Sequence, residues 1–191
     1  MLNLKKLSTV KPSKGVLLLA EPFMADPHFR RTVVVLCENQ RSGSIGFILN
    51  RPTPLKLPEA IDGILVNFDA PLYYGGPVQT DTLHFVHNVE NLDGAIKIID
   101  GLYWGGDFEQ LKELINTNAV RPENFRFFVG YSGWDVSQLD NEIAANSWIT
   151  YPAKAYHVFK SPPETLWKDV LREMGGEFAL MVNFPEDPQM N

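Results

Sequence analysis

Short apolar segments separated by glycine- or proline-containing turns fill the first half of this chain. Residues 15–20, 32–37 and 44–50 are the clearest examples, and the second is dense in β-branched side chains, which favour strands. No long helix can be placed between these segments, whereas parallel strands need a long crossover connection. We therefore expect neighbouring strands to pair antiparallel. Shorter segments of the same kind lie at residues 72–74, 83–87 and 95–99.

Helical patterns come later in the chain. Three pairs of residues have the spacing of a capping box, in which an N-cap side chain precedes a glutamine or glutamate by three positions. These pairs are Asp107 with Gln110, Asp135 with Gln138, and Ser161 with Glu164. Apolar side chains at helical spacing follow each pair. Further strands are predicted at residues 125–129, 148–151 and 156–159, so the chain is expected to have an α+β fold.

One domain, residues 15–182, accounts for most of the chain. The 191 residues are 45% hydrophobic and 21% charged, which suits a single sizeable core. Residues 52–70 are proline-rich and are expected to be irregular, apart from a helical turn near Glu59. Residues 183–191 are expected to form a loose C-terminal tail.

Residues 1–14 form a basic N-terminal arm. They include Lys5, Lys6, Lys11 and Lys14 and no acidic residue, so the arm carries +4. Since the whole chain carries −6, the rest carries −10. Such an arm could contact phosphate groups or a membrane surface. A solvated terminus is the commoner meaning of such a charge run, and we expect that here.

The overall acidity disfavours nucleic acid as the main partner, because a net charge of −6 repels phosphate backbones. The longest apolar runs reach five residues, whereas a transmembrane helix needs about 20. The N-terminus lacks the apolar stretch of a secretory signal. Cys37 is the single cysteine, which excludes an internal disulfide. We therefore expect a cytoplasmic protein without a membrane partner.

Five spaced motifs resemble the AlgH/YqgE family in their order along the chain. They are Leu19-Ala20-Glu21-Pro22 followed by Asp26-Pro27-His28-Phe29-Arg30-Arg31; Gly46-Phe47-Ile48-Leu49-Asn50-Arg51-Pro52; Tyr74-Gly75-Gly76-Pro77-Val78; Val129-Gly130-Tyr131-Ser132-Gly133-Trp134; and Gln138-Leu139 with Glu142-Ile143, Asn146 and Trp148. The resemblance covers about residues 15–175. It is weak between Leu55 and Ala70, where this chain looks shorter than the family pattern.

The resemblance implies a compact single domain of a bacterial cytosolic protein, built on a mostly antiparallel, barrel-like sheet with flanking helices. Members of the family are often described as transcriptional regulators, and one family name refers to alginate production. No catalytic residue of the family is established that could be transferred to this chain. The resemblance therefore implies a fold but no settled activity.

The segment 130–134, Gly-Tyr-Ser-Gly-Trp, lies between a predicted strand and a predicted helix, where a hydrolase nucleophile would lie. A nucleophile elbow has the pattern Gly-x-Ser-x-Gly, but Trp134 replaces the second glycine. Asp140 and His157 follow in triad order, as such residues do in any chain of this length. We interpret the segment mainly as a glycine-permitted turn. Its backbone N–H groups are an alternative anion site, although Asp135 is placed to cap them.

Histidine and cysteine offer weaker candidates. His84 and His87 are three positions apart in a predicted strand, so their side chains should face opposite sides and should not share a metal ion. Cys37 lies beside Glu38, whose charge opposes thiolate formation, so we expect a core cysteine. The glycines match no phosphate-binding loop. We expect neither a metal nor another cofactor.

Polar and aromatic residues at the ends of the predicted elements form the candidate binding site. Arginine, tyrosine and tryptophan are enriched where proteins recognise partners. The structural alternative is that the arginines hold loop carbonyls and the aromatic rings fill the core. The candidate residues are Arg30, Arg31, Asn50, Arg51, Gly75, Gly76, Tyr131, Ser132, Gly133 and Trp134.

A non-enzymatic binding or regulatory protein is the favoured function, with an unidentified small molecule or protein as the partner. Two alternatives are kept. A transcriptional regulator would bind DNA in a salt-sensitive way that depends on the lysines of the arm. A hydrolase would use Ser132 as its nucleophile.

Overall fold

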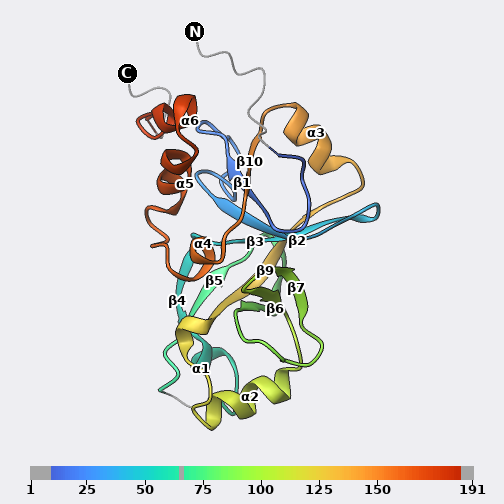
Figure 1. Cartoon of the computed structure of the whole chain (residues 1–191), viewed down its shortest axis with the longest axis vertical. Helices are drawn as coiled ribbons and strands as arrows, with labels where there is room; N and C mark the ends of the chain where they lie inside the picture. The colour runs from blue at the N-terminus through green and yellow to red at the C-terminus, as the bar shows by residue number, and fades with distance from the viewer. Residues whose placement is uncertain (1–9, 65–66, 186–191) are drawn as a thin grey trace.

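A ten-stranded sheet runs through the molecule and carries helices at both ends (Figure 1). The structure, a computed structural model, describes residues 10–64 and 67–185. The main strand order is β10-β1-β2-β3-β9-β6-β8-β7, while β4 pairs with β5 and β5 pairs with β9. All of these pairs are antiparallel except β5 with β9. The expected α+β fold with a mostly antiparallel sheet is confirmed. The sheet is not closed into a barrel, because its order ends at β10 and β7.

The strands are β1 (Val16–Ala20), β2 (Val33–Gln40), β3 (Gly43–Ile48), β4 (Pro52–Lys56), β5 (Pro71–Tyr74), β6 (Val78–His87), β7 (Ile96–Ile99), β8 (Leu102–Trp104), β9 (Phe125–Trp134) and β10 (Trp148–Pro152). The helices are α1 (Leu57–Ala60), α2 (Phe108–Asn116), the 3₁₀ turn η2 (Pro122–Asn124), α3 (Gln138–Ala144), α4 (Ala155–Phe159), α5 (Leu166–Met174) and α6 (Gly176–Met181).

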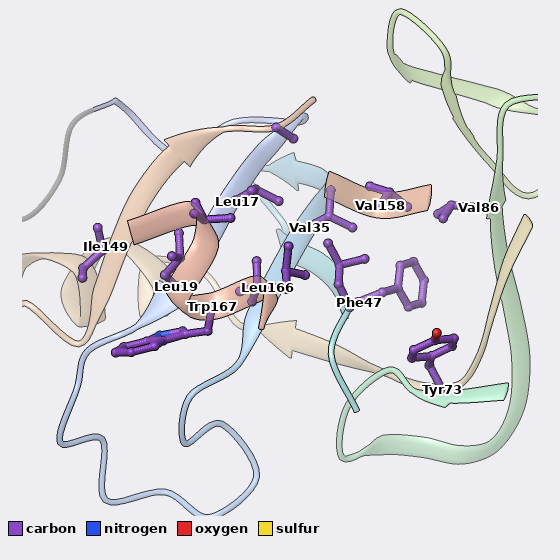
Figure 2. Close-up of a cluster of buried hydrophobic side chains, with 14 of the residues drawn as sticks. Leu17, Leu19, Val35, Phe47, Tyr73, Val86, Ile149, Val158, Leu166 and Trp167 are labelled. Carbon is purple, nitrogen blue, oxygen red and sulfur yellow. The ribbon is translucent and has the colours of Figure 1, made fainter. Parts of the chain in front are cut away.

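The upper half of the sheet in Figure 1 is buried on both faces, which explains why β1 and β2 are continuous apolar runs rather than alternating ones. Leu17, Leu19 and Val35 point to one face and pack with α4, α5 and α6. Figure 2 shows Val158, Leu166 and Trp167 over these strands. On the other face, Leu18 and Val34 pack with residues of α3 and β10.

The lower half has its own core, in which α1 and α2 cover β5, β6 and β9 (Figure 1). Phe85, Phe125 and Phe127 form its aromatic centre. The Asp107 side chain caps α2 by accepting from the backbone N–H of Gln110 at 2.7 Å, as the capping pattern predicted.

Strand β9 joins the two halves, and glycines let it cross its neighbours closely. Its first part pairs with β5 and β6, and its last part pairs with β3. A Cβ on Gly75 would lie 2.3 Å from the Gly130 carbonyl oxygen, and one on Gly130 would lie 2.6 Å from that of Gly76. Gly130 has a φ of +67°, a conformation that glycine adopts without strain. The glycine motifs are therefore explained by backbone packing at this crossing.

Several local predictions were wrong. Residues 156–159 belong to helix α4 rather than to a strand, and residues 52–56 form strand β4 despite two prolines. Proline is tolerated there because β4 has a hydrogen-bonded neighbour, β5, on one side only. Helices α3 and α5 begin after Ser137 and Thr165, and neither side chain makes a capping hydrogen bond.

Both chain ends pack onto the sheet as far as the structure describes them. The backbone of Val10 exchanges hydrogen bonds with the Thr150 hydroxyl at 3.1 and 2.7 Å. At the other end, the ring of Phe184 stacks on Phe23, with 5.5 Å between ring centres. Residues 1–9 of the basic arm and residues 186–191 of the predicted tail lie outside the described residues.

Candidate functional site

Residues 130–134 are the end of strand β9 and not a turn before a helix, which corrects the prediction for this segment. Ser132 is fully buried, and its hydroxyl donates a hydrogen bond of 3.0 Å to the Gly75 carbonyl. Helix α3 starts four residues after Trp134, behind Ser137 in a left-handed conformation. The strained strand-to-helix turn that exposes a hydrolase serine is therefore not formed here.

Two hollows meet at Trp134. The first has a volume of about 410 Å³ and lies between the β2–β3 hairpin and the end of β9, where Tyr131 lines it. The second has about 350 Å³ and lies between Trp134, Trp148 and the segment before β2. Both are lined by Gly133, Trp134 and Gln138, so the two hollows adjoin at these residues.

Further hollows adjoin these two. A small one of about 30 Å³ shares Ser44 and Asp135 with the first hollow. A larger one of about 300 Å³ shares Glu21 and Ser147 with the second and is lined by Phe23, among other residues. We call the four together the acidic groove. Residues of α3 line three of the four hollows, namely Gln138, Leu139, Asp140 and Glu142.

The charge of the acidic groove has one sign. Among the described residues that line the four hollows, none is lysine, arginine or histidine. The acidic side chains that line it are Glu21, Asp26, Glu38, Asp135, Asp140 and Glu142. Such a lining with aromatic walls concentrates negative potential, because field lines are focused in a depression with a low-dielectric wall.

Glu142 holds the two tryptophans of the groove in place. One of its carboxylate oxygens accepts from the indole N–H groups of Trp134 and Trp148 at 2.9 and 2.7 Å. The other accepts from the Gln138 amide at 2.9 Å, and the Gln138 oxygen accepts from the backbone N–H of Asp135. Phe29 packs against both indole rings, with ring centres 6.3 and 5.4 Å away. The groove wall is therefore preorganised by hydrogen bonds to a carboxylate.

The arginine motifs lie at another depression. A hollow of about 190 Å³ is lined by Arg31, Asn50, Arg51, Pro163, Glu164, Trp167 and Lys168, and we call it the basic hollow. The Arg31 guanidinium lies over the Trp167 ring at 4.2 Å from its centre. The same guanidinium donates to the carbonyls of Phe184 and Pro185 at 2.8 and 2.9 Å.

Asn50 and Arg51 fasten the chain before β2. The Asn50 amide donates to the Arg31 carbonyl at 2.9 Å and accepts from the backbone N–H of Val33, also at 2.9 Å. Arg51 donates to the Arg30 carbonyl. These bonds match the structural alternative weighed for the arginines, in which their side chains hold loop carbonyls.

The candidate residues thus divide among three places. Tyr131, Gly133 and Trp134 line the acidic groove, while Arg31, Asn50 and Arg51 line the basic hollow. Gly75, Gly76 and Ser132 lie at the strand crossing, and Arg30 is exposed beside the basic hollow, held through its carbonyl.

One segment borders both places. Residues 21–31 connect β1 to β2, and Met24, Asp26 and Phe29 line the acidic groove while Arg31 lines the basic hollow. Asp26 organises the segment, because its side chain accepts from the backbone N–H of His28 and its carbonyl accepts from Phe29 and Arg30.

The acids of the groove were not predicted as site residues. Glu142 and Trp148 belong to the last sequence motif, and their spacing of six residues gives no local sign that they touch. Glu38 was considered only for its effect on Cys37. The feature that these acids share is that they lie near a tryptophan. This feature can be recognised only when it is known that β3, β9 and the 21–31 segment meet.

Of the histidine and cysteine candidates, His87 and Cys37 are buried and His84 is partly buried. His84 packs against Phe47 at 5.3 Å between ring centres, and His87 packs against Phe85 at 5.7 Å, in a different core cluster. The two side chains face opposite sides of β6, as predicted. Cys37 is buried, and burial raises the pKa of its thiol.

Within residues 10–64 and 67–185, no three His, Cys, Asp or Glu side chains are grouped so that they could hold a metal ion. No helix in these ranges has the length and apolarity to cross a bilayer.

Comparison with known proteins places this architecture in a family. The AlgH-like family matches residues 17–179. A protein named UPF0301 from Chlorobaculum tepidum is 47% identical over 183 residues, which cover 95% of this chain and 96% of that protein. A UPF0301 protein from Chlorobium limicola is 46% identical over 178 residues, covering 93% and 95%.

Solved structures agree with the fold. The solution structure of the AlgH protein from Pseudomonas aeruginosa has a TM-score of 0.70 and 29% identity, and the match covers 92% of this chain and 98% of that one. The crystal structure of protein DIP2367 from Corynebacterium diphtheriae has a TM-score of 0.75 at 24% identity, covering 92% and 94%, and supports the fold alone. With a family match along most of its length and relatives close to half identical, this chain belongs to the AlgH-like family.

Proposed function

We propose that this protein is a non-enzymatic binding protein and that its acidic groove takes a cationic group of the partner. The lining of the groove supports this proposal. It combines six carboxylates with the rings of Phe29, Tyr131, Trp134 and Trp148. Among the described residues that line the groove, none is basic. An ammonium or guanidinium group gains from both components, because carboxylates attract it and the partly exposed rings of Phe29 and Tyr131 offer faces that bind cations.

The shape of the groove fits this role. Its two central hollows of about 410 and 350 Å³ lie in the size range of binding pockets. Trp134 and Trp148 are held by Glu142 before any ligand arrives, so little side-chain entropy would be lost on binding.

The two alternatives have less support. A hydrolase that uses Ser132 needs an accessible hydroxyl next to a base, but this hydroxyl is buried and donates to a backbone carbonyl. A DNA-binding regulator needs a positive surface, and the two hollows that meet at Trp134 are lined by acids and, among the described residues, by no basic one. The basic arm and the basic hollow would have to supply the contact.

A titration monitored by ¹⁵N NMR would test the proposal. The probe is Nα-acetyl-lysine methylamide, and its uncharged counterpart is Nα-acetyl-norleucine methylamide. We expect the charged probe to shift the indole N–H signals of Trp134 and Trp148 and to leave those of Trp104 and Trp167 in place. Each signal is assigned from a Trp→Phe variant. The shifts should decrease as salt is raised, because exposed charges are screened.

A pair of matched variants separates local from overall charge. Glu38→Gln combined with Asp135→Asn removes two charges from the groove and should weaken probe binding about fivefold. Glu113→Gln combined with Glu123→Gln removes the same charge from α2 and η2, no residue of which lines the groove, and should change the affinity by less than about 1.5-fold. Equal effects of the two pairs, or equal shifts with the norleucine probe, would rule the proposal out.

A further inference from the structure

We infer that the partner is an extended polypeptide segment in which a basic side chain lies close to an apolar one. This inference rests on the proposed function and names the class of molecule that the groove would recognise. It starts from the end of the acidic groove that the cationic group does not explain, which is the hollow around Phe23.

This end of the groove is more apolar than its centre. Its hollow of about 300 Å³ is lined by Pro22, Phe23, Met181 and Phe184, among others. The Phe23 side chain is 43% exposed although its ring stacks on Phe184. An exposed, stacked aromatic pair is a ready contact for an apolar side chain, because the ring has already lost its rotational freedom.

The apolar end and the acidic centre are continuous. Glu21 and Ser147 line both the Phe23 hollow and the hollow of Trp134 and Trp148. Asn146 and Ser147 lie between them and supply an amide and a hydroxyl that can bond to a peptide backbone. A ligand that fills both ends must therefore be elongated and must change from cationic to apolar along its length.

Other classes of ligand fit this combination less well. A polyamine supplies charge but no apolar side branch for the Phe23 hollow. A lipid headgroup or a nucleic acid brings phosphate, which six carboxylates repel and which no lysine or arginine in the described lining could hold. A polypeptide with adjacent basic and apolar side chains satisfies the carboxylates, the rings and the apolar end together.

Isothermal titration calorimetry of the full chain would test the inference. The probes are capped hexapeptides with one lysine and one leucine, separated by zero, one or two glycines. The comparison ligands are the same peptides with serine in place of leucine, and spermidine. We expect the best lysine–leucine peptide to bind about tenfold more tightly than its lysine–serine counterpart, because a leucine side chain leaves water.

Variants at the surface assign that gain to the Phe23 hollow. Phe23→Ser should abolish most of the tenfold difference, because it should weaken binding of the lysine–leucine peptide more than binding of the lysine–serine peptide. Leu55→Ser is the matched control, because Leu55 is 48% exposed on β4 and lines none of the four hollows. It should leave both affinities unchanged.

Each outcome separates this inference from the proposed function. If the lysine–leucine and lysine–serine peptides bind equally, or spermidine binds as tightly as the best peptide, the polypeptide inference is wrong and the cation site stands. If no probe binds, both are wrong. If the chain forms dimers that the peptides dissociate without a leucine preference, the occupant of the groove is a second copy, and the inference is overturned.

Discussion

Trp134 and Trp167 are both almost fully buried, with 5% and 3% of their surfaces exposed, yet they lie in surroundings of opposite charge. The indole N–H of Trp134 donates to the Glu142 carboxylate, and its hollows are lined by acids. The indole N–H of Trp167 donates to the Ala20 carbonyl at 2.9 Å, and its ring is covered by the Arg31 guanidinium.

Charge is therefore distributed unevenly over this chain, whose net charge is −6. The arginines that resembled a recognition surface in the sequence are largely engaged with backbone carbonyls. Among the acids of the groove, Glu38, Asp135 and Asp140 are instead on exposed or half-exposed positions. An arginine whose side chain holds a loop and an acid whose side chain lines a hollow therefore contribute differently to ligand binding, even when the two side chains are similarly exposed.

The largest expected effect concerns the anchoring of the groove tryptophans. Glu142→Leu leaves the indole N–H groups of Trp134 and Trp148 without their acceptor, so we expect the free energy of unfolding to fall by about 3 kcal/mol. The measurement is urea denaturation followed by circular dichroism. Trp167→Phe removes a hydrogen bond to a neutral carbonyl and should cost about half as much.

A double-mutant cycle makes this test specific. Trp148→Phe should cost less in the Glu142→Leu background than in the wild type, because the lost acceptor no longer matters there. If the changes in unfolding free energy caused by the two substitutions are additive, the Glu142 carboxylate does not anchor the Trp148 ring. Trp134 and Trp167 would then differ only in the charge of the residues around them.

A smaller effect is expected when the pH is lowered, and it arises in the helix that carries Trp167. Helix α5 carries Glu173, whose carboxylate is the common acceptor of four side chains. Desolvation favours protonation of this carboxyl, but the hydrogen bonds outweigh it and hold its pKa at about 2. The donors are Tyr151 at 3.1 Å, Lys154 at 2.6 Å, Tyr156 at 2.5 Å and His157 at 2.9 Å.

Because the pKa of Glu173 is lowered on folding from 4.5, its stabilising effect is complete above pH 4.5 and is lost as the pH falls towards 2. Glu173→Gln should therefore lower the free energy of unfolding by about 2 kcal/mol at pH 7. The difference from the wild type should shrink between pH 4.5 and pH 2 in urea denaturation at a series of pH values. A difference that stays constant down to pH 2 would contradict the network.

The smallest expected effect tests whether the two regions are electrostatically separate. Lys168 lines the basic hollow and is exposed. Lys168→Gln should change the affinity of the acidic groove for Nα-acetyl-lysine methylamide by less than about twofold, because surface charges are screened over about 8 Å at physiological salt. The same NMR titration measures it. A change of more than threefold would show that the two regions share one field.

The sequence predicted the elements whose pattern is local. The strands at residues 15–20 and 32–37 and the Asp107 cap depend on neighbouring residues and were confirmed. Residues 156–159 were predicted as a strand because Tyr156, Val158 and Phe159 have β-favouring side chains, but packing of Val158 onto the sheet made them a helix. Tertiary contacts outweigh propensity in such short segments.

The candidate site was less predictable, because contacts between distant segments form it. Trp134 was selected as a candidate, but Glu142 and Asp26 were not, since nothing in the sequence brings them next to one indole ring. The glycine motifs drew attention for the opposite reason. Gly75, Gly76 and Gly130 stand out in the sequence because a strand crossing excludes a Cβ, which is a steric requirement and not a chemical one.

The position of the 21–31 segment also has a thermodynamic consequence. Its inner residues line the acidic groove, and its last residue, Arg31, lines the basic hollow, while Asn50 and Arg51 hold the carbonyls of Arg31 and Arg30. A molecule that displaces this segment when it enters one depression must alter the walls of the other. Thermodynamic linkage then requires reciprocity: each occupant would change the dissociation constant of the other by the same factor.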